Sequence, residues 1–423
     1  MKNRLVGWVA WSVLAGTLGC GEGDAAAPPN DGSPSVASDR GPDTDAALDA
    51  TLDAARDRPD CALGDWTGST SRTLTLACSP YHFEAPLQVD GDATLTIEAG
   101  VELRFAAGTS LSVGYGPGKL VALGTPTLPI VFTSSQAAPT LGSWSGLYFG
   151  EETLSGSAIS HAIVSYAGEP GDDLDACVTI RVALPGRLAI DHTLFEGCRT
   201  AAVSNNSAGF RFQSFTANTF KDCESGLYLD SNTIGSVQAA QTYTNTPRNR
   251  VTEGPVTRSV TWAGQPVPWV FDGALEIEDV EDSNHPILTL EAGNTLQFAS
   301  GAAVSVGYYA GGGLVANGTA AEPVTFESSQ PGATPGSWAG IGLWENTAAT
   351  SRLNHAIIRH AGQPVSIYRG GLTCGSAHSL VMPIENTTFE LNARVDVSLC
   401  DCPLVTEAGN TYSSGGFDRD DCD

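Results

Sequence analysis

From residue 61 onward, apolar and polar residues alternate in short runs along the chain. In LTI, VELRF, LSV and PIVFTS, for example, every second side chain is apolar. Gly, Pro, Asn and Ser interrupt these runs about every 8–12 residues, which is the spacing of turns in an all-β protein. The period of two predicts short β-strands with one buried face, and no sustained helical stripe accompanies it. The pattern therefore predicts an all-β fold and excludes βαβ units.

A long stretch of this pattern occurs twice. Thr96–Tyr115 reads TIEAGVELRFAAGTSLSVGY and Thr289–Tyr308 reads TLEAGNTLQFASGAAVSVGY, with 12 of 20 positions identical in an ungapped alignment. Further along, GSWSGL and SHAIVSYAG are matched by GSWAGI and NHAIIRHAG. The duplication predicts two tandem blocks, residues 61–255 and 256–423, with a junction rich in Thr, Asn and Gln at 231–255.

A shorter period runs inside the first block. Phe195 and Phe220 lie 25 residues apart, and so do Cys198 and Cys223. A unit of about 20–30 residues that cannot bury its apolar face alone is typical of a solenoid, in which coils stack on one another. The chain from residue 61 has room for roughly a dozen such coils. One continuous stack is favoured over two, because separate stacks would expose open sheet ends.

The segment EAGVELRFAAGTSLSVGYGPGKLVALGTPTLPIVFTSS, followed by GSWSGLYF and SHAIVSYAG, resembles the right-handed parallel β-helix repeat proteins of bacteria. These proteins belong to the pectate-lyase-like superfamily, and many are exported lipoproteins or surface proteins. The resemblance covers most of Arg72–Tyr412. It implies an all-β, single-stranded right-handed parallel β-helix built from two tandem pseudo-repeats. It is specific for the fold and not for the function, since the superfamily includes lyases, hydrolases and adhesins.

Two functions are compatible with this resemblance. The favoured one is a non-catalytic, lipid-anchored cell-surface protein that serves as a scaffold, an adhesin or a glycan-binding module. The alternative is a polysaccharide lyase or glycoside hydrolase on the same fold. An enzyme of this kind needs acids and a base from different coils to converge in one groove. The placement of those side chains therefore discriminates between the two functions.

The N-terminus predicts export. A positively charged start precedes an apolar run, Leu5–Leu18, which is too short for a permanent membrane span. The sequence TLGC, ending at Cys20, resembles the lipobox of bacterial lipoproteins, which implies a signal peptide at 1–20 and lipidation of Cys20. Ordinary signal-peptidase cleavage nearby is the alternative. Gly21 after the cysteine implies, by the sorting rule of such lipoproteins, an anchor in the outer membrane.

Composition and charge restrict the partners. Residues 21–60 hold Ala, Asp, Pro, Gly and Ser with few large apolar side chains, so we expect a disordered acidic linker. The 423-residue chain has 47 acids and 21 bases, a formal charge of −26. This charge argues against nucleic acid or an anionic membrane as a partner. We expect a cell-surface glycan or protein as partner, membrane contact only through the N-terminal lipid, and a monomer.

The ten cysteines of an exported chain predict disulfide bonds. Lipidation of Cys20 leaves nine, so at least one has no partner within the chain. Cys198 and Cys223 occupy equivalent points of successive coils, where a disulfide and a buried reduced pair are both compatible with the spacing. Cys177 and Cys374 have no assigned partner, and no cysteine has metal-ligand spacing with a histidine. The pairs predicted to fasten the two ends of the stack are Cys61 with Cys78, and Cys402 (or Cys400) with Cys422.

Candidate catalytic residues cluster in the first block. A β-helix lyase needs a base beside a substrate carboxylate, and a hydrolase needs two or three converging carboxylates. Because lysine is nearly absent from the mature chain, an arginine would have to act as the base. The candidates are Asp172, Asp173, Asp191, His192 and Arg199. The acidic loop is also a candidate calcium site through Asp172, Asp173 and Asp175. No other cofactor is expected.

These candidates have structural alternatives. Asp191-His192 is equally a polar corner between two strands, and the acidic loop is equally a solvated surface loop. His161 and His355 recur in SHAI and NHAI, and repetition within a duplicated block favours a structural role. We expect each of them to fill one hydrogen-bonded corner.

Three tyrosines are candidate ligand-binding residues. Tyr115, Tyr308 and Tyr309 lie in the Gly-rich turns GYGPG and GYYAGGG. Aromatic rings that are exposed on a flat β-surface bind sugars by stacking. The alternative is that these rings pack over the neighbouring coil.

Overall fold

The computed structural model describes residues 61, 63, 66–168, 176–252, 254–281, 284–364, 367–375, 381–399, 402 and 404–418. All of them belong to one compact unit, Asp53–Asp423. Strands dominate its regular structure, and the only helices in the described ranges are the 3-10 turn η1 (Leu76–Cys78) and the single turn α2 (Ser231–Ile234).

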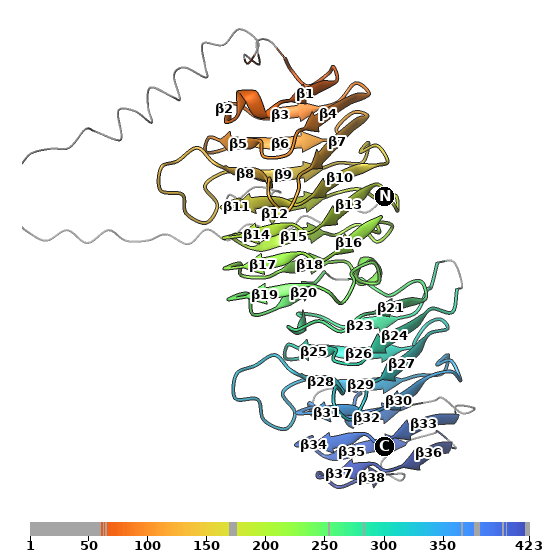
Figure 1. Cartoon of the computed structure of the whole chain (residues 1–423). Helices are drawn as coiled ribbons and strands as arrows, with labels where there is room; N and C mark the ends of the chain where they lie inside the picture. Colours follow the sequence, from red (N-terminus) through yellow and green to blue (C-terminus); the bar gives the residue numbers. More distant parts are fainter. Residues whose placement is uncertain are drawn as a thin grey trace, which may run out of the picture. The chain divides into compact units, whose positions relative to one another are not determined.

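In the first block, successive strands turn from one sheet to the next, and equivalent strands of successive coils pair in parallel (Figure 1). Sheet A holds the first strand of each coil: β1 (Arg72–Leu74), β4 (Ala93–Ile97), β7 (Gly118–Leu123), β10 (Ser157–Ser160), β13 (Leu188–Asp191) and β16 (Ser214–Thr216). Sheet B holds the second: β2 (Tyr81–Phe83), β5 (Glu102–Phe105), β8 (Ile130–Ser134), β11 (Ala162–Ser165), β14 (Leu194–Glu196), β17 (Thr219–Lys221) and β19 (Thr242–Thr244).

Sheet C is the longest, with 13 strands, one from each coil of the described chain. Its first-block members are β3 (Leu87–Val89), β6 (Ser110–Val113), β9 (Gly146–Phe149), β12 (Ala176–Ile180), β15 (Ala201–Asn205), β18 (Leu227–Leu229) and β20 (Asn249–Val251). Its second-block members are β22 (Trp269–Phe271), β25 (Thr295–Phe298), β28 (Val324–Ser328), β31 (Ala356–Arg359), β34 (Thr388–Glu390) and β37 (Thr411–Tyr412).

Two further sheets complete the second block. Sheet D contains β21 (Val260–Trp262), β24 (Ile287–Glu291), β27 (Gly313–Asn317), β30 (Arg352–Asn354), β33 (Val381–Glu385) and β36 (Leu404–Ala408). Sheet E contains β23 (Leu275–Ile277), β26 (Ala303–Val306), β29 (Gly340–Leu343), β32 (Gly370–Cys374), β35 (Val395–Leu399) and β38 (Phe417–Asp418). The predicted single-stranded right-handed parallel β-helix is confirmed, as one continuous stack.

The two blocks join with a shift of one strand position. Sheet C takes the third strand of each coil in the first block but the second strand of each coil in the second block, from β22 onward. The pairing that makes the shift is Arg250 with Tyr228 on one side and with Val270 on the other. Turns that are equivalent in sequence therefore border different sheets in the two blocks.

Side chains of successive coils stack in the interior, and the same aromatic stack occurs once in each of the two blocks. In the first block, Phe83, Phe105 and Trp144 stack with centroid distances of 5.0 and 4.3 Å and near-parallel planes. The second block repeats this stack with Phe271, Phe298 and Trp338, at 4.9 and 4.6 Å. Alternation explains the placement, because every second side chain of a strand points inward.

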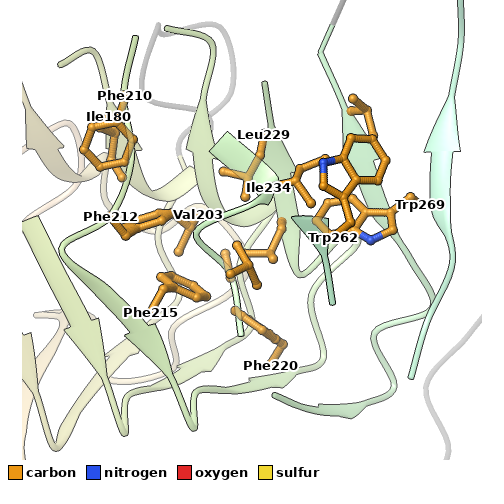
Figure 2. Close-up of a cluster of buried hydrophobic side chains, with 14 of the residues drawn as sticks. Ile180, Val203, Phe210, Phe212, Phe215, Phe220, Leu229, Ile234, Trp262 and Trp269 are labelled. Carbon is orange, nitrogen blue, oxygen red and sulfur yellow. The ribbon is translucent and has the colours of Figure 1, made fainter. Parts of the chain in front are cut away.

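At the junction the continuous core is rich in aromatic side chains (Figure 2). The Phe212 and Phe215 rings lie 4.4 Å apart, and Trp262 and Trp269 lie 6.1 Å apart. The Trp262 Nε1 atom donates a hydrogen bond to the carbonyl oxygen of Ser231 at 3.1 Å, which ties β21 to α2. Large aromatic side chains therefore fill the interior where the strand positions of the two blocks shift.

The disulfides correct part of the prediction. The predicted Cys61–Cys78 bond is present at the start of the stack, with a Cα–Cα distance of 5.2 Å. Cys402 bonds to Cys374 at 6.1 Å, and the predicted partner Cys422 lies outside the described residues, as does Cys400. The bond crosses from the end of β32 to the segment before β36. A link to Cys422 was therefore the wrong choice for Cys402.

The second correction concerns Cys198 and Cys223. Cys198 bonds to Cys177, 21 residues earlier, with a Cα–Cα distance of 5.5 Å. Cys223 is a buried free thiol, and its Sγ accepts a hydrogen bond from the Cys198 backbone N–H at 3.4 Å. Because Cys198 can form one disulfide only, a Cys198–Cys223 bond is excluded. Burial raises the pKa of the Cys223 thiol to about 11.

Candidate functional site

Asp191 and His192 lie at the turn where β13 leads into β14. Oδ1 of Asp191 accepts hydrogen bonds from Ser214 Oγ at 2.7 Å and from Thr216 N at 3.0 Å, both on the next coil. The His192 ring stacks on that of His161 with a centroid distance of 4.7 Å. Asp191 therefore links two coils, which agrees with the alternative of a polar corner between two strands.

The same corner explains the repeated histidines. His161, His192 and His355 have backbone φ angles of 48°, 50° and 48°, in the left-handed region that His, Asn and Asp tolerate better than most residues. Nδ1 of His161 lies 3.0 Å from Ser160 Oγ, and Nδ1 of His355 lies 3.0 Å from Asn354 Oδ1. The structure thus has the hydrogen-bonded corners that we expected in both blocks.

Arg199 lies at a different turn, the one between β14 and β15, with an exposed side chain. Strand β14 lies between it and His192 along the chain. Asp172 and Asp173 lie outside the described residues, as does Asp175, the third calcium candidate. The candidates that can be placed therefore lie at two different turns.

Tyr115 stands at the turn after β6 and is 60% exposed. Its ring stacks on Tyr148 of β9, in the next coil, with a centroid distance of 5.0 Å and an interplanar angle of 14°. Burial and the neighbouring Tyr115 raise the pKa of the Tyr148 hydroxyl, so Tyr148 is uncharged at neutral pH. One face of the Tyr115 ring packs on the next coil, as the structural alternative requires, and the side chain remains exposed; ligand binding by Tyr115 stays a prediction.

The second-block tyrosines belong to a different cluster. Tyr309 is 73% exposed and meets Tyr308 edge to face at 4.6 Å. Tyr308 in turn meets Trp344, also edge to face, at 5.3 Å. The Glu278 carboxylate accepts hydrogen bonds from the backbone N–H groups of Tyr309 and Ala310 at 2.6 and 3.2 Å, which holds the turn in place. This cluster follows β26 and lies beside sheet E.

A cleft of about 510 Å³ opens on the outer side of sheet C. It passes β12, β15, β18, β20 and β22, four strand-to-strand steps that together measure roughly 19 Å. It begins in the first block and ends in the second. Its lining residues include Arg181, Thr200, Ser204, Asn206, Tyr228, Thr252 and Asp272.

The cleft lies beside a row of outward side chains. The strand register places Tyr148, Thr179, Ser204 and Tyr228 in line on four successive strands. Two small side chains therefore lie between two tyrosines. The hydroxyl of Ser204 donates to Thr179 Oγ1 at 3.4 Å, which keeps both side chains close to the sheet.

Tyr228 is the tyrosine that lines the cleft, beside Phe271 of β22. The Arg250 guanidinium lies over its ring, 4.7 Å from the centroid. Nη2 of Arg250 also donates to Asp272 Oδ2 at 2.8 Å. The three side chains form a braced unit in which the positive and negative charges compensate each other.

These cleft residues were not among the sequence candidates. Alternation in LYL marks Tyr228 as an outward side chain. It does not reveal Ser204 and Arg250 as neighbours, because that requires the register between coils. The sequence alone offered one indication of this site, an outward tyrosine on a short strand close to the block junction.

The described residues were also compared with the side-chain groupings of metal sites and with the helices of membrane spans. Across the part of the chain that the structure describes, no three His, Cys, Asp or Glu side chains are grouped so as to hold a metal ion. No helix in these same residues has the length and hydropathy needed to cross a membrane. Cys20, the lipidation candidate, lies outside the described residues.

The fold agrees with a comparison to known families. A family model described as a pectate-lyase like beta helix domain matches residues 68–206. The match includes β1 to β15, and hence the Tyr115–Tyr148 pair and part of the cleft. No curated protein and no solved structure matches the chain.

Proposed function

The chain contains a pectate-lyase-like β-helix domain at residues 68–206, and from this premise we propose that it is a non-catalytic, lipid-anchored protein that binds glycans at the cell surface. The observation that carries the proposal is the exposure of tyrosine rings at Gly-rich turns of both blocks. Tyr115 and Tyr309 are 60% and 73% exposed, and each is held by a second aromatic ring. A braced, exposed ring is suited to stacking on the apolar face of a sugar.

The chemistry of the turns supports binding over catalysis. Asp191 is occupied by hydrogen bonds within the sheet, and Arg199 lies at another turn. A lyase or hydrolase needs its acids and base within hydrogen-bond reach of one substrate atom. The polysaccharide lyase or glycoside hydrolase remains the second candidate function, favoured by the family match alone.

Binding is tested with the soluble β-helix on an array of bacterial and plant glycans. We expect Tyr115→Ala and Tyr309→Ala each to weaken binding of the glycans that wild type retains, and the double variant to weaken it further. Leu184→Ala is the matched control, because Leu184 is a large exposed side chain, 49% accessible, that is not aromatic. Wild-type protein that binds no glycan, or tyrosine variants that behave like the control, would contradict the proposal.

The enzyme alternative is tested by turnover. The protein is incubated with pectin, alginate, xylan and glucan, and both new reducing ends and the absorbance of unsaturated uronides are measured. Loss of any turnover in Asp191→Asn or Arg199→Ala, with folding retained, would favour the enzyme over the binding protein. We expect no turnover of these polymers.

The lipid anchor is tested at Cys20. In a bacterial host that carries out lipoprotein processing, we expect the wild-type chain to partition into the detergent phase and to incorporate labelled palmitate. Cys20→Ser should lose both properties. Equal partitioning of the two proteins would exclude the anchor without affecting glycan binding by the β-helix.

A further inference from the structure

The cleft on sheet C points to a second binding site, away from the exposed turns. We infer that it binds a neutral oligosaccharide, with Tyr228 as the stacking ring. The ligand class rests on the proposed glycan binding, whereas the location rests on the cleft itself.

The first argument is the accessibility of the Tyr228 ring. Arg250 on β20 covers one face of the ring at 4.7 Å. On the other side the neighbour in register is Ser204 of β15, and beyond it Thr179 of β12. Because both side chains are small, the second face of Tyr228 borders the cleft rather than another large side chain.

The second argument is rigidity. The Arg250 guanidinium is itself held by Asp272 at 2.8 Å, so the ring has a fixed support beneath it. A ring that is already fixed loses little conformational freedom when a sugar stacks on it. The same contact compensates the charge of Asp272 inside the cleft.

The third argument is the polarity of the lining. Thr200, Asn206 and Thr252 provide hydroxyl and amide groups, which suit the hydroxyls of a sugar. The Thr252 Oγ1 atom is buried and has no hydrogen-bond partner among the described residues. An unpaired buried hydroxyl costs free energy, so this wall of the cleft is less stable than a fully paired one.

The charge of the molecule selects a neutral ligand. Arg181 and Asp272 are the charged side chains in the lining, one of each sign. The chain as a whole carries a formal charge of −26, which repels polyanions. A neutral oligosaccharide avoids this repulsion. It can extend along the roughly 19 Å over which the strands of the cleft are stacked.

The cleft lies where sheet C changes from the third strand of each coil, in the first block, to the second strand of each coil, in the second block. Strands β12, β15 and β18 supply one end of the cleft from the first block. Phe271 of β22 and Asp272, which follows that strand, supply the other end from the second block. Neither block alone contains both ends. The inference therefore assigns a binding role to the junction, which neither copy of the duplicated sequence has by itself.

The test is isothermal titration of the intact β-helix with neutral hexasaccharides of cellulose, xylan, mannan and starch type, and with hexagalacturonate. We expect at least one neutral hexasaccharide to bind, and Tyr228→Ala to weaken that binding about tenfold. Tyr228→Phe, which keeps the ring, should bind within about twofold of wild type. Ser204→Trp, which fills the gap beside the ring, should abolish binding. Leu391→Ala is the matched control, since it removes a large exposed side chain, 53% accessible, that does not line the cleft.

The outcomes separate this inference from the proposed function. If wild type binds a hexasaccharide but Tyr228→Ala and Ser204→Trp bind it equally well, the cleft is not the site, although glycan binding stands. If no saccharide binds wild type, both proposals fail. Binding of hexagalacturonate alone would overturn the neutral ligand class. Thermal unfolding midpoints within a few degrees of wild type show that each variant is folded.

Discussion

Strand β9 of the first block and strand β29 of the second are equivalent in sequence, yet their outer sides differ. Tyr148 projects outward from β9 and stacks on Tyr115. The equivalent position of β29 is Gly342, where a Cβ atom would lie 2.6 Å from the Tyr368 ring and 2.7 Å from the Trp344 ring. Trp344 folds back over the glycine and its Nε1 donates to Ser305 Oγ at 3.0 Å. One block has an outward ring on the strand, and the other has a ring that covers it.

The interiors of the same two blocks are nearly interchangeable. Trp144 and Trp338 are both fully buried, and each donates its Nε1 hydrogen to a backbone carbonyl at 2.8 Å, those of Ser165 and Arg359. In a solenoid the inward positions of every coil face the same packed core, so duplication preserves them. The outward positions have no such restriction. The comparison teaches that the two copies keep the same core while their outward strand positions can diverge, as Tyr148 and Gly342 do.

The largest effect on stability is expected from the two equivalent core tryptophans, Trp144 and Trp338. We expect Trp144→Ala and Trp338→Ala each to lower the free energy of unfolding by about 3–5 kcal/mol, because each removes a fully buried ring and leaves a cavity. Denaturant unfolding followed by circular dichroism measures both. Trp344→Ala is the control, since that ring belongs to a small separate cluster with Tyr368 rather than to the main core, and its loss should cost less. A difference of more than about 2 kcal/mol between the two core variants would break the equivalence.

The next largest effect is expected from removing the disulfide of each block, because the two bonds close loops of different length. Cys177–Cys198 and Cys374–Cys402 span 21 and 28 residues. Loop closure in the unfolded chain predicts similar stabilisation by each bond, about 3 kcal/mol. We therefore expect the double alanine variants of the two pairs to lose similar stability in denaturant unfolding. A much smaller loss for the Cys374–Cys402 pair would mean that the last coils unfold separately from the rest.

A smaller effect is expected at Gly342. Gly342→Ala places a Cβ atom against the Trp344 and Tyr368 rings, so we expect a loss of about 1–3 kcal/mol from overpacking. Combining it with Trp344→Ala should recover part of that loss, because the obstructing ring is gone. Differential scanning fluorimetry of the single and double variants measures the recovery. Additive losses would show that the two side chains do not compete for the same space.

Much of the fold could be predicted because the inward pattern is local. Alternation placed the strands, and the recurrence of Phe195 and Phe220 gave the coil length, since every coil must bury the same kind of face. The pairing at Arg250 could not be predicted. Alternation shows which side chains point inward, but not which strand of the next coil lies beneath a given strand.

The candidate site shows the same limit. Cys177, Cys198 and Cys223 recur at spacings of 21 and 25 residues, and both spacings permit a disulfide between neighbouring coils. Tyr228 was equally inconspicuous, because its neighbours in the cleft come from other coils. By contrast, the exposed Tyr115 was identified from its Gly-rich turn alone. Chemistry within one turn is readable from the sequence, whereas chemistry between coils depends on register.

The smallest effect is expected in the pH dependence of stability, and it concerns His360, which aligns with Tyr166 of the first block. Both residues have a backbone φ of 62°, but only the histidine titrates near neutral pH. Burial and the nearby Arg359 lower the pKa of His360, and its Nδ1 atom has no hydrogen-bond partner among the described residues. Glu327 and Glu390 oppose this shift but do not reverse it.

The sign of the resulting pH dependence follows from this lowered pKa. The folded protein favours neutral His360, so this contribution to stability is present above about pH 6.5, the pKa of an unperturbed histidine. It is lost as the pH falls through that value toward the lower pKa of the folded state. We therefore expect wild type to lose more stability between pH 8 and pH 5.5 than His360→Tyr, which copies the first block. Thermal unfolding at the two pH values measures the difference, and an NMR titration of His360 gives the pKa directly. Equal losses in the two proteins, or a pKa above that of an unperturbed histidine, would contradict the burial of this ring.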